Sequence, residues 1–253
     1  MGKRNSKKIS VVQNWIYCVP LLVIVFFVPM IVLLKVNPID PNITKLMFGQ
    51  EANFDFFSYY KANIFTFATG FAILMLVAFM FRKGIKLNRT IAYIPLIIYA
   101  FAIILSAKMS PYKELSLTGT IDRYEGLYVL LCYLLICAVC INMVNNEKII
   151  RYLMLSLGIS AVVICLIGLS QLIEHDIFRT KFGLGLIIPG EYRELVKSID
   201  FKFDQIYATF MNPNYVGSYM AMIALLALSY LIFIKGIWHK LFASVILILS
   251  LVN

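Results

Sequence analysis

The residues whose types and spacing could do chemistry lie in two polar segments of a very apolar chain. One is Gly119-Thr-Ile-Asp-Arg-Tyr-Glu-Gly126, in which glycines flank Arg123. The other runs from about Glu174 to Asn214 and carries eleven of the chain's 23 basic and 13 acidic residues. The guanidinium of an arginine is always charged and fits phosphate oxygens. We therefore predict that Arg123 binds a phosphate or diphosphate. The alternative is an anchoring turn in which Arg123 pairs with Asp122 or Glu125.

The second segment ends in an asparagine-rich turn, Thr209-Phe-Met-Asn-Pro-Asn214. Proline disfavours helix in the residue before it and suits the first turn of a following helix, so Asn212 or Asn214 is predicted to cap a helix. Because a helix N-terminus attracts anions, both asparagines are candidate substrate-binding residues.

Two further cations of this segment, Arg193 and Lys202, lie in the stretch from Pro189 to Phe203. Its apolar residues recur at helical spacing, which predicts a short helix in the plane of a membrane surface. Arg193 and Lys202 would then face an anionic lipid head. The alternative is a plain amphipathic cover over the rest of the protein.

The sequence predicts neither a metal nor a cofactor. All five cysteines lie in apolar runs, and the pair Cys137-x-x-Cys140 has no second pair and no nearby histidine, so we interpret them as packing residues. His175 could act as a base, although a lone interfacial histidine is more often only polar.

Composition identifies the class of protein that positions these residues. Hydrophobic residues make up 61% of the chain and charged residues 14%, whereas soluble domains carry about 25% charged residues. The chain is therefore expected to be an all-α integral membrane protein. Twelve Lys or Arg and one acid fall on the predicted inner side, against eleven basic and twelve acidic residues on the outer side. This positive-inside asymmetry explains the net charge of +10 without nucleic acid, and it places the N-terminus in the cytoplasm.

Apolar runs near 20 residues long predict a polytopic helix bundle, a single membrane domain of about six complete spans and a truncated seventh. The predicted spans are about 15–34, 62–81, 91–107, 127–144, 152–172, 215–234 and 237–253, with outer loops 35–61, 108–126 and 173–214. Because the last run is short, we expect residues 1–253 to be the N-terminal portion of a longer protein. Gly217 and Ala221 form a small-residue pair, which predicts close helix packing.

Thr209-Phe-Met-Asn-Pro-Asn-Tyr-Val-Gly217, with Ser110-Pro111 and the Arg123 segment, resembles the O-antigen ligase and polymerase family of membrane glycosyltransferases. The resemblance implies a GT-C-like helical fold in the bacterial cytoplasmic membrane, without a metal. It also implies transfer of a glycan from a polyprenyl-diphosphate carrier to an acceptor glycan, lipid or protein outside the cytoplasm. Arg123 would be catalytic, by stabilising charge on the departing diphosphate.

The sequence departs from that family before the Asn-Pro-Asn turn. Members often carry an arginine there, whereas this chain has Asp204-Gln-Ile-Tyr207, so the role is vacant or falls to Lys202 or Arg193. A later outer loop with further Arg and His residues would lie beyond Asn253, and the fragment alone is expected to be inactive. Two alternatives stay open: a membrane transporter of lipid-linked sugar or polysaccharide, and a non-catalytic membrane subunit.

Overall fold

The computed structural model describes residues 15–38, 52–83, 87–121, 123–193, 205–210 and 212–253. These residues are mostly helical, and the chain divides into two compact units. Unit 1 comprises Met1–Val28 and Ala62–Ser156, and unit 2 comprises Pro29–Lys61 and Leu157–Asn253. Each unit is described by itself.

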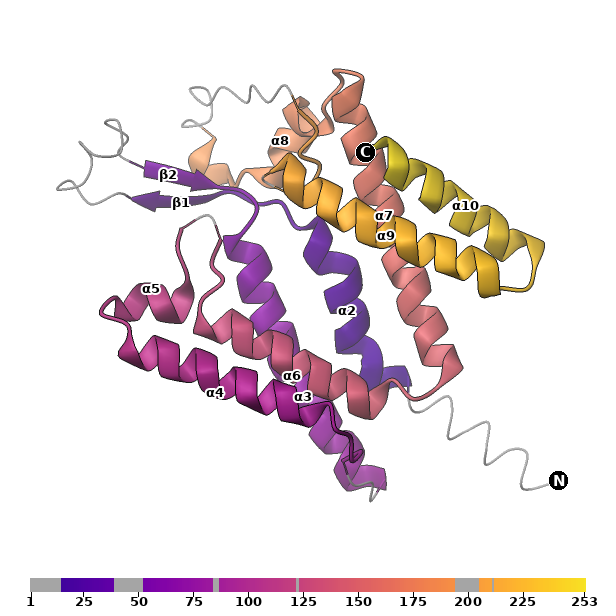
Figure 1. The fold of residues 1–253 in the computed structure, drawn as a ribbon. Helices are drawn as coiled ribbons and strands as arrows, with labels where there is room; N and C mark the ends of the chain where they lie inside the picture. Colours follow the sequence, from indigo (N-terminus) through magenta and orange to yellow (C-terminus); the bar gives the residue numbers. More distant parts are fainter. Residues whose placement is uncertain (1–14, 39–51, 84–86, 122, 194–204, 211) are drawn as a thin grey trace. The chain divides into compact units, whose positions relative to one another are not determined.

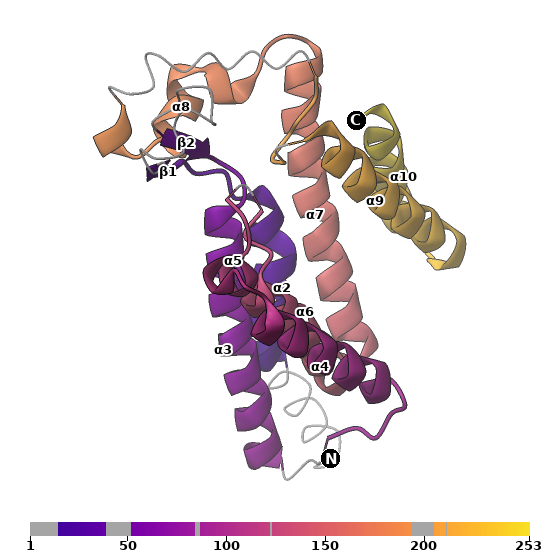
Figure 2. The same cartoon turned by 60° about the vertical axis from the view of Figure 1, so that its left-hand side comes forward.

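Unit 1 is a group of helices (Figures 1 and 2), and it contains an apolar core. Its elements are the 3-10 helix η1 (Trp15–Cys18), α2 (Val19–Phe27), α3 (Tyr59–Lys83, from Ala62), α4 (Tyr93–Met109), α5 (Lys113–Thr118), α6 (Leu127–Met143) and the start of α7 (Glu147–Leu172). Leu21 of α2, Ala72 of α3 and Val139 of α6 are buried together in the core. Helix α4 packs on α6, so the predicted outer loop 108–126 connects two helices that are in contact.

A buried amide joins α4 to α6. Asn142 of α6 donates to the Tyr93 hydroxyl at 2.6 Å and accepts from the backbone N–H of Asn88 at 2.8 Å. A buried amide must find hydrogen-bond partners, so these bonds fix where the chain enters α4.

Unit 2 combines the later helices with a small sheet. Its elements are β1 (Lys35–Pro38), β2 (Ala52–Asp55), the rest of α7, the 3-10 helices η3 (Ile177–Arg179) and η4 (Gly190–Tyr192), α8 (Lys181–Ile187), α9 (Pro213–Phe233) and α10 (Ile237–Val252). The strands are antiparallel, with Lys35 opposite Asp55, and lie beside α8 (Figure 2). Helices α9 and α10 pack side by side in both views.

The first predicted span differs from the observed structure. Regular α-helix ends at Phe27, followed by a 3-10 turn from Val28 to Met30. Pro29 explains the change, because it disfavours α-helix at the preceding residue and supplies no N–H. Beyond it, the N–H of Leu34 donates to the carbonyl of Ile187 at 2.8 Å. Residues 31–34 therefore lead into the sheet rather than extending the helix.

Three of the described helices are long and apolar enough to cross a membrane: Tyr59–Arg82, Glu147–Leu172 and Pro213–Phe233. Shorter apolar helices cover Ile16–Met30, Tyr93–Met109, Leu127–Met143 and Ile237–Val252. Large apolar side chains such as Phe67 and Ile91 are more than 80% exposed. Outward-facing apolar surface on this scale marks a protein that associates with a membrane.

The expected packing of Gly217 and Ala221 is not observed within the described residues. Both are exposed, and a Cβ added at Gly217 would meet nothing within 4 Å. The buried face of α9 is formed by Val216, Met220, Ile223 and Ala227. These larger residues recur at helical spacing, so the face of α9 that is buried is the one they form and not the one that carries Gly217 and Ala221.

Candidate functional site

The Arg123 turn of unit 1 is closed by its two glycines. Gly119 has φ +89°, and a Cβ added there would lie 2.4 Å from the backbone nitrogen of Glu125. A Cβ added at Gly126 would lie 2.4 Å from the backbone nitrogen of Gly119. Two backbones this close leave no room for a side chain, so glycine is needed at both positions. The seven-residue spacing thus forms a loop with its ends in contact.

Arg123 is exposed on this loop. Its backbone N–H and that of Tyr124 donate to the carbonyl of Thr120 at 3.2 and 2.9 Å. Among the described residues, the Arg123 guanidinium forms no ion pair, and Glu125 instead accepts from the Tyr133 hydroxyl at 3.2 Å. Arg123 thus does not pair with Glu125, and Asp122, the other partner in the alternative interpretation, lies outside the described residues.

The asparagine-rich turn of unit 2 begins α9. Asn212 is the N-cap, and its side-chain oxygen accepts from the N–H of Asn214 at 2.8 Å, with Pro213 as the first helical residue. The predicted cap is confirmed for Asn212. Asn214 is exposed in the first turn, and its carbonyl accepts from the Ser218 hydroxyl at 2.8 Å.

The residues just before this turn are held by partners far away in sequence. Thr209 is fully buried, and its hydroxyl donates to the carbonyl of Pro29 at 2.8 Å. The ammonium of Lys61, in the first turn of α3, donates to the carbonyl of Thr209 and lies 4.5 Å from the ring centre of Phe210. These contacts join Lys61 to the segment just before α9.

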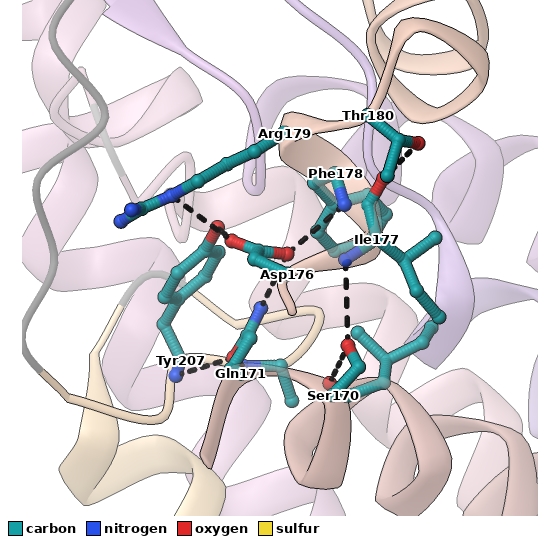
Figure 3. A network of polar contacts seen from close by, with 10 residues as sticks. Ser170, Gln171, Asp176, Ile177, Phe178, Arg179, Thr180 and Tyr207 are labelled. Atoms are coloured by element: carbon teal, nitrogen blue, oxygen red, sulfur yellow. Dashed lines mark hydrogen bonds and ion pairs between the residues drawn. The ribbon is translucent and has the colours of Figure 1, made fainter. Parts of the chain in front are cut away.

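A polar network centred on Asp176 joins the segment after α7 to Tyr207 (Figure 3). The Asp176 carboxylate accepts from the N–H of Phe178 at 2.9 Å and from the hydroxyl of Tyr207, and it lies 3.5 Å from Nε of Arg179. Burial, followed by the hydrogen bond to Asp176, raises the pKa of Tyr207. The phenol therefore remains a proton donor to the carboxylate at neutral pH.

Gln171, near the end of α7, joins this network to the turn. Its side-chain oxygen accepts from the backbone N–H groups of Tyr207 at 3.0 Å and Ala208 at 2.7 Å. Its amide nitrogen lies 3.5 Å from the Asp176 carboxylate. One side chain thus positions both the loop after α7 and the segment before α9.

These residues surround a pocket of about 450 Å³. Its polar lining consists of Gln171, Glu174, Asp176, Arg179, Gln205 and Tyr207. All six belong to unit 2. A pocket of this volume is large enough for a small ligand.

Backbone strain concentrates in these same segments. Three described non-glycine residues have positive φ: Tyr124 (52°), Glu174 (60°) and Ala208 (43°). Tyr124 follows Arg123, Glu174 lines the pocket, and Ala208 follows Tyr207. Such conformations are costly and persist where the surrounding contacts enforce them, which is frequent at functional sites.

Of the remaining predicted site residues, the described one, Arg193, does not line the pocket. Arg193 is exposed at the end of η4, and its N–H donates to the carbonyl of Gly190 at 3.5 Å. Lys202 and most of the predicted interfacial helix lie outside the described residues. Within the described part of the chain, no three His, Cys, Asp or Glu side chains are placed to hold a metal ion.

Sequence reasoning missed Lys61, Gln171, Asp176, Arg179 and Tyr207. The cation that lines the pocket with Gln205 and Tyr207 is Arg179, the last residue of η3. The available signal was Asp176 with Arg179 three residues later, a spacing that brings two side chains together in a helical turn. Comparisons with protein-family models, curated proteins and solved structures gave no match.

Proposed function

We propose that this chain is a membrane glycosyltransferase resembling O-antigen ligases and polymerases. It transfers a glycan from a polyprenyl diphosphate to an acceptor glycan, lipid or protein outside the bacterial cytoplasmic membrane. The observation that carries the proposal is the glycine-closed turn, which displays Arg123 without an ion pair among the described residues. A guanidinium exposed on a glycine-closed loop is suited to bind a diphosphate.

In this proposal the main charge that the enzyme must stabilise develops on the departing diphosphate. Breaking the bond between sugar and diphosphate leaves negative charge on the phosphate oxygens, and a positioned cation stabilises that charge in the transition state. The backbone of the Arg123 turn is already ordered by glycine contacts and by bonds to Thr120. Less ordering is then required when the diphosphate binds.

The turn that begins α9 supports the same proposal. Asn212 and Asn214 are exposed at the start of a 21-residue apolar helix, where backbone N–H groups favour anions and hydroxyls. Arg193 and Lys202 are proposed to contribute further cations to substrate binding.

We also propose the membrane arrangement that this reaction needs. The seven apolar helices would cross the membrane in a GT-C-like bundle, with the N-terminus in the cytoplasm and the two polar segments outside. Helices α4 and α6 have 17 residues each, the lower end of the length that spans a bilayer.

Replacement of Arg123 tests the proposed function. In cells whose own gene is deleted, the full-length Arg123→Ala protein should lower transfer of the lipid-linked glycan about 100-fold or more, the usual cost of losing a transition-state donor. The lipid-linked precursor should accumulate. Arg123→Lys should recover part of the activity, because lysine retains the charge but not the fork.

Arg151→Ala is the matched control, because Arg151 is also an exposed arginine but lies on the predicted cytoplasmic side. It should leave product and precursor unchanged. Immunoblots of isolated membranes must show equal amounts of each variant. Unchanged product in Arg123→Ala at equal protein level contradicts the proposed role of Arg123.

A further inference from the structure

The pocket at the end of α7 carries exposed polar side chains. Glu174 and Gln205 are exposed, and their side chains make no hydrogen bond with the described residues. The Arg179 side chain is 45% exposed; it lies 3.5 Å from Asp176 and also interacts with the side chain of Tyr207. A carboxylate, an amide and the exposed part of a guanidinium therefore face a ligand.

The other polar groups of the pocket are already satisfied. The Asp176 carboxylate is engaged by Phe178, Arg179 and Tyr207, and the Gln171 oxygen by two backbone N–H groups. These bonds make the inner wall rigid. Pre-organised walls lower the entropy that a ligand must lose on binding.

The charge of the pocket argues against a diphosphate there. Its described lining contains two carboxylates, Glu174 and Asp176, and one cation, Arg179, which gives a formal charge of −1. The Arg179 charge is also balanced by Asp176 at 3.5 Å. These described lining groups would repel a diphosphate on balance, but not an uncharged ligand.

We infer that this pocket binds an uncharged sugar residue of a glycan. A sugar hydroxyl donates one hydrogen bond and accepts others. Glu174 can accept, Arg179 can donate, and the Gln205 amide can do both. The strained backbone of Glu174 holds one of these groups at the pocket wall. The inference depends on the proposed function only for the origin of the glycan.

Binding is measured with full-length protein in lipid nanodiscs. The probe is the repeat-unit oligosaccharide released from the cells' lipid-linked precursor and freed of phosphate, observed by saturation-transfer NMR. Wild-type protein should bind it, and Glu174→Ala, Arg179→Ala and Gln205→Ala should each weaken binding about tenfold, the effect of losing one hydrogen bond in a binding site. Inorganic pyrophosphate should not compete.

Two exposed residues outside the pocket lining supply matched controls, Glu191→Ala for the carboxylate and Lys181→Ala for the cation. Both should bind the oligosaccharide like wild type. Gln205→Ala keeps the test decisive if Arg179→Ala misfolds, because the Gln205 side chain supports no described contact. Absence of binding by wild type, equal binding by Gln205→Ala and Glu174→Ala, or competition by pyrophosphate overturns the inference.

The two proposals fail separately. Loss of transfer in Arg123→Ala with unchanged oligosaccharide binding in all pocket variants retains the proposed function and rejects the sugar pocket. Normal transfer in Arg123→Ala with weakened binding in the pocket variants rejects the role of Arg123 and retains the pocket.

Discussion

Gln171 accepts hydrogen bonds from two successive backbone N–H groups, and the shorter, 2.7 Å long, comes from Ala208, 37 residues later in the chain. Ala208 is fully buried and has φ +43°. The amide at the end of α7 therefore holds a strained peptide just before the turn that begins α9. This relationship connects the pocket to the asparagine-rich motif.

Gln171→Ala should destabilise the protein. It leaves the N–H groups of Tyr207 and Ala208 without their acceptor, and each unsatisfied buried group costs about 1–3 kcal/mol. The expected result is a clear fall in the temperature at which detergent-solubilised protein loses its monodisperse chromatographic peak. Gln205→Ala removes an exposed amide and should stay within about 0.5 kcal/mol of wild type. Equal melting of the two variants contradicts the assigned role of Gln171.

Gly119→Ala should disrupt the Arg123 turn. The new methyl would lie 2.4 Å from a backbone nitrogen at a φ of +89°, so the loop must open. Glycan transfer should fall toward the level of Arg123→Ala. Gly185→Ala is the control, because a Cβ there meets nothing within 4 Å and the residue lies inside α8. It should be neutral or stabilising by up to about 1 kcal/mol, and a similar loss of transfer in both variants would reject the turn as the cause.

Glu174→Gly should stabilise the protein while weakening sugar binding. Helix α7 ends in a Schellman motif. The backbone N–H of His175 donates to the carbonyl of Ser170 at 2.8 Å, and that of Glu174 donates to the carbonyl of Gln171 at 3.1 Å. Glycine is the usual residue at the left-handed position, and relief of the strain is worth about 1 kcal/mol. Glu191→Gly, at a residue without positive φ, should lower the melting temperature instead. A lower melting temperature for Glu174→Gly would contradict the strain argument.

Tyr207 predicts a loss of stability at alkaline pH. Burial and the bond to Asp176 raise the pKa of Tyr207 above its ordinary value of about 10. Above pH 10 the unfolded chain therefore releases this proton while the folded chain retains it, so stability falls as pH rises. Tyr207→Phe should show a shallower decline of melting temperature between about pH 9 and 11. Parallel curves for wild type and Tyr207→Phe would show that Tyr207 makes no such contribution.

Single cysteines at Arg123 and Asn212 test the proposed membrane arrangement. With the five native cysteines replaced by alanine, both variants should react with a membrane-impermeant maleimide added outside intact cells, since exposed thiols react as thiolates. A cysteine at Lys148 should react only after the membrane is opened. Labelling of positions 123 and 212 from opposite sides of the membrane would show that the two motifs cannot form one site, and it would contradict the proposed arrangement.

The amino-acid sequence by itself determined the features that depend on neighbouring residues. Apolar runs indicated the helices, and Asn212-Pro213 indicated where α9 starts, because capping and proline geometry are local. The two glycines flanking Arg123 indicated a tight turn for the same reason. In contrast, the four-residue strands β1 and β2 are too short to give an alternating pattern.

Only the tertiary structure decided which distant groups meet. Lys61 reaches the carbonyl of Thr209 across 148 positions in sequence, and Gln171, Arg179 and Tyr207 line one pocket. No spacing rule predicts such pairs, because they arise where buried donors and acceptors from separate elements must satisfy one another. The motifs could therefore be predicted from local sequence. That Arg179 is the cation beside Gln205 and Tyr207 follows only from the tertiary structure, in which Asp176 contacts both Arg179 and Tyr207.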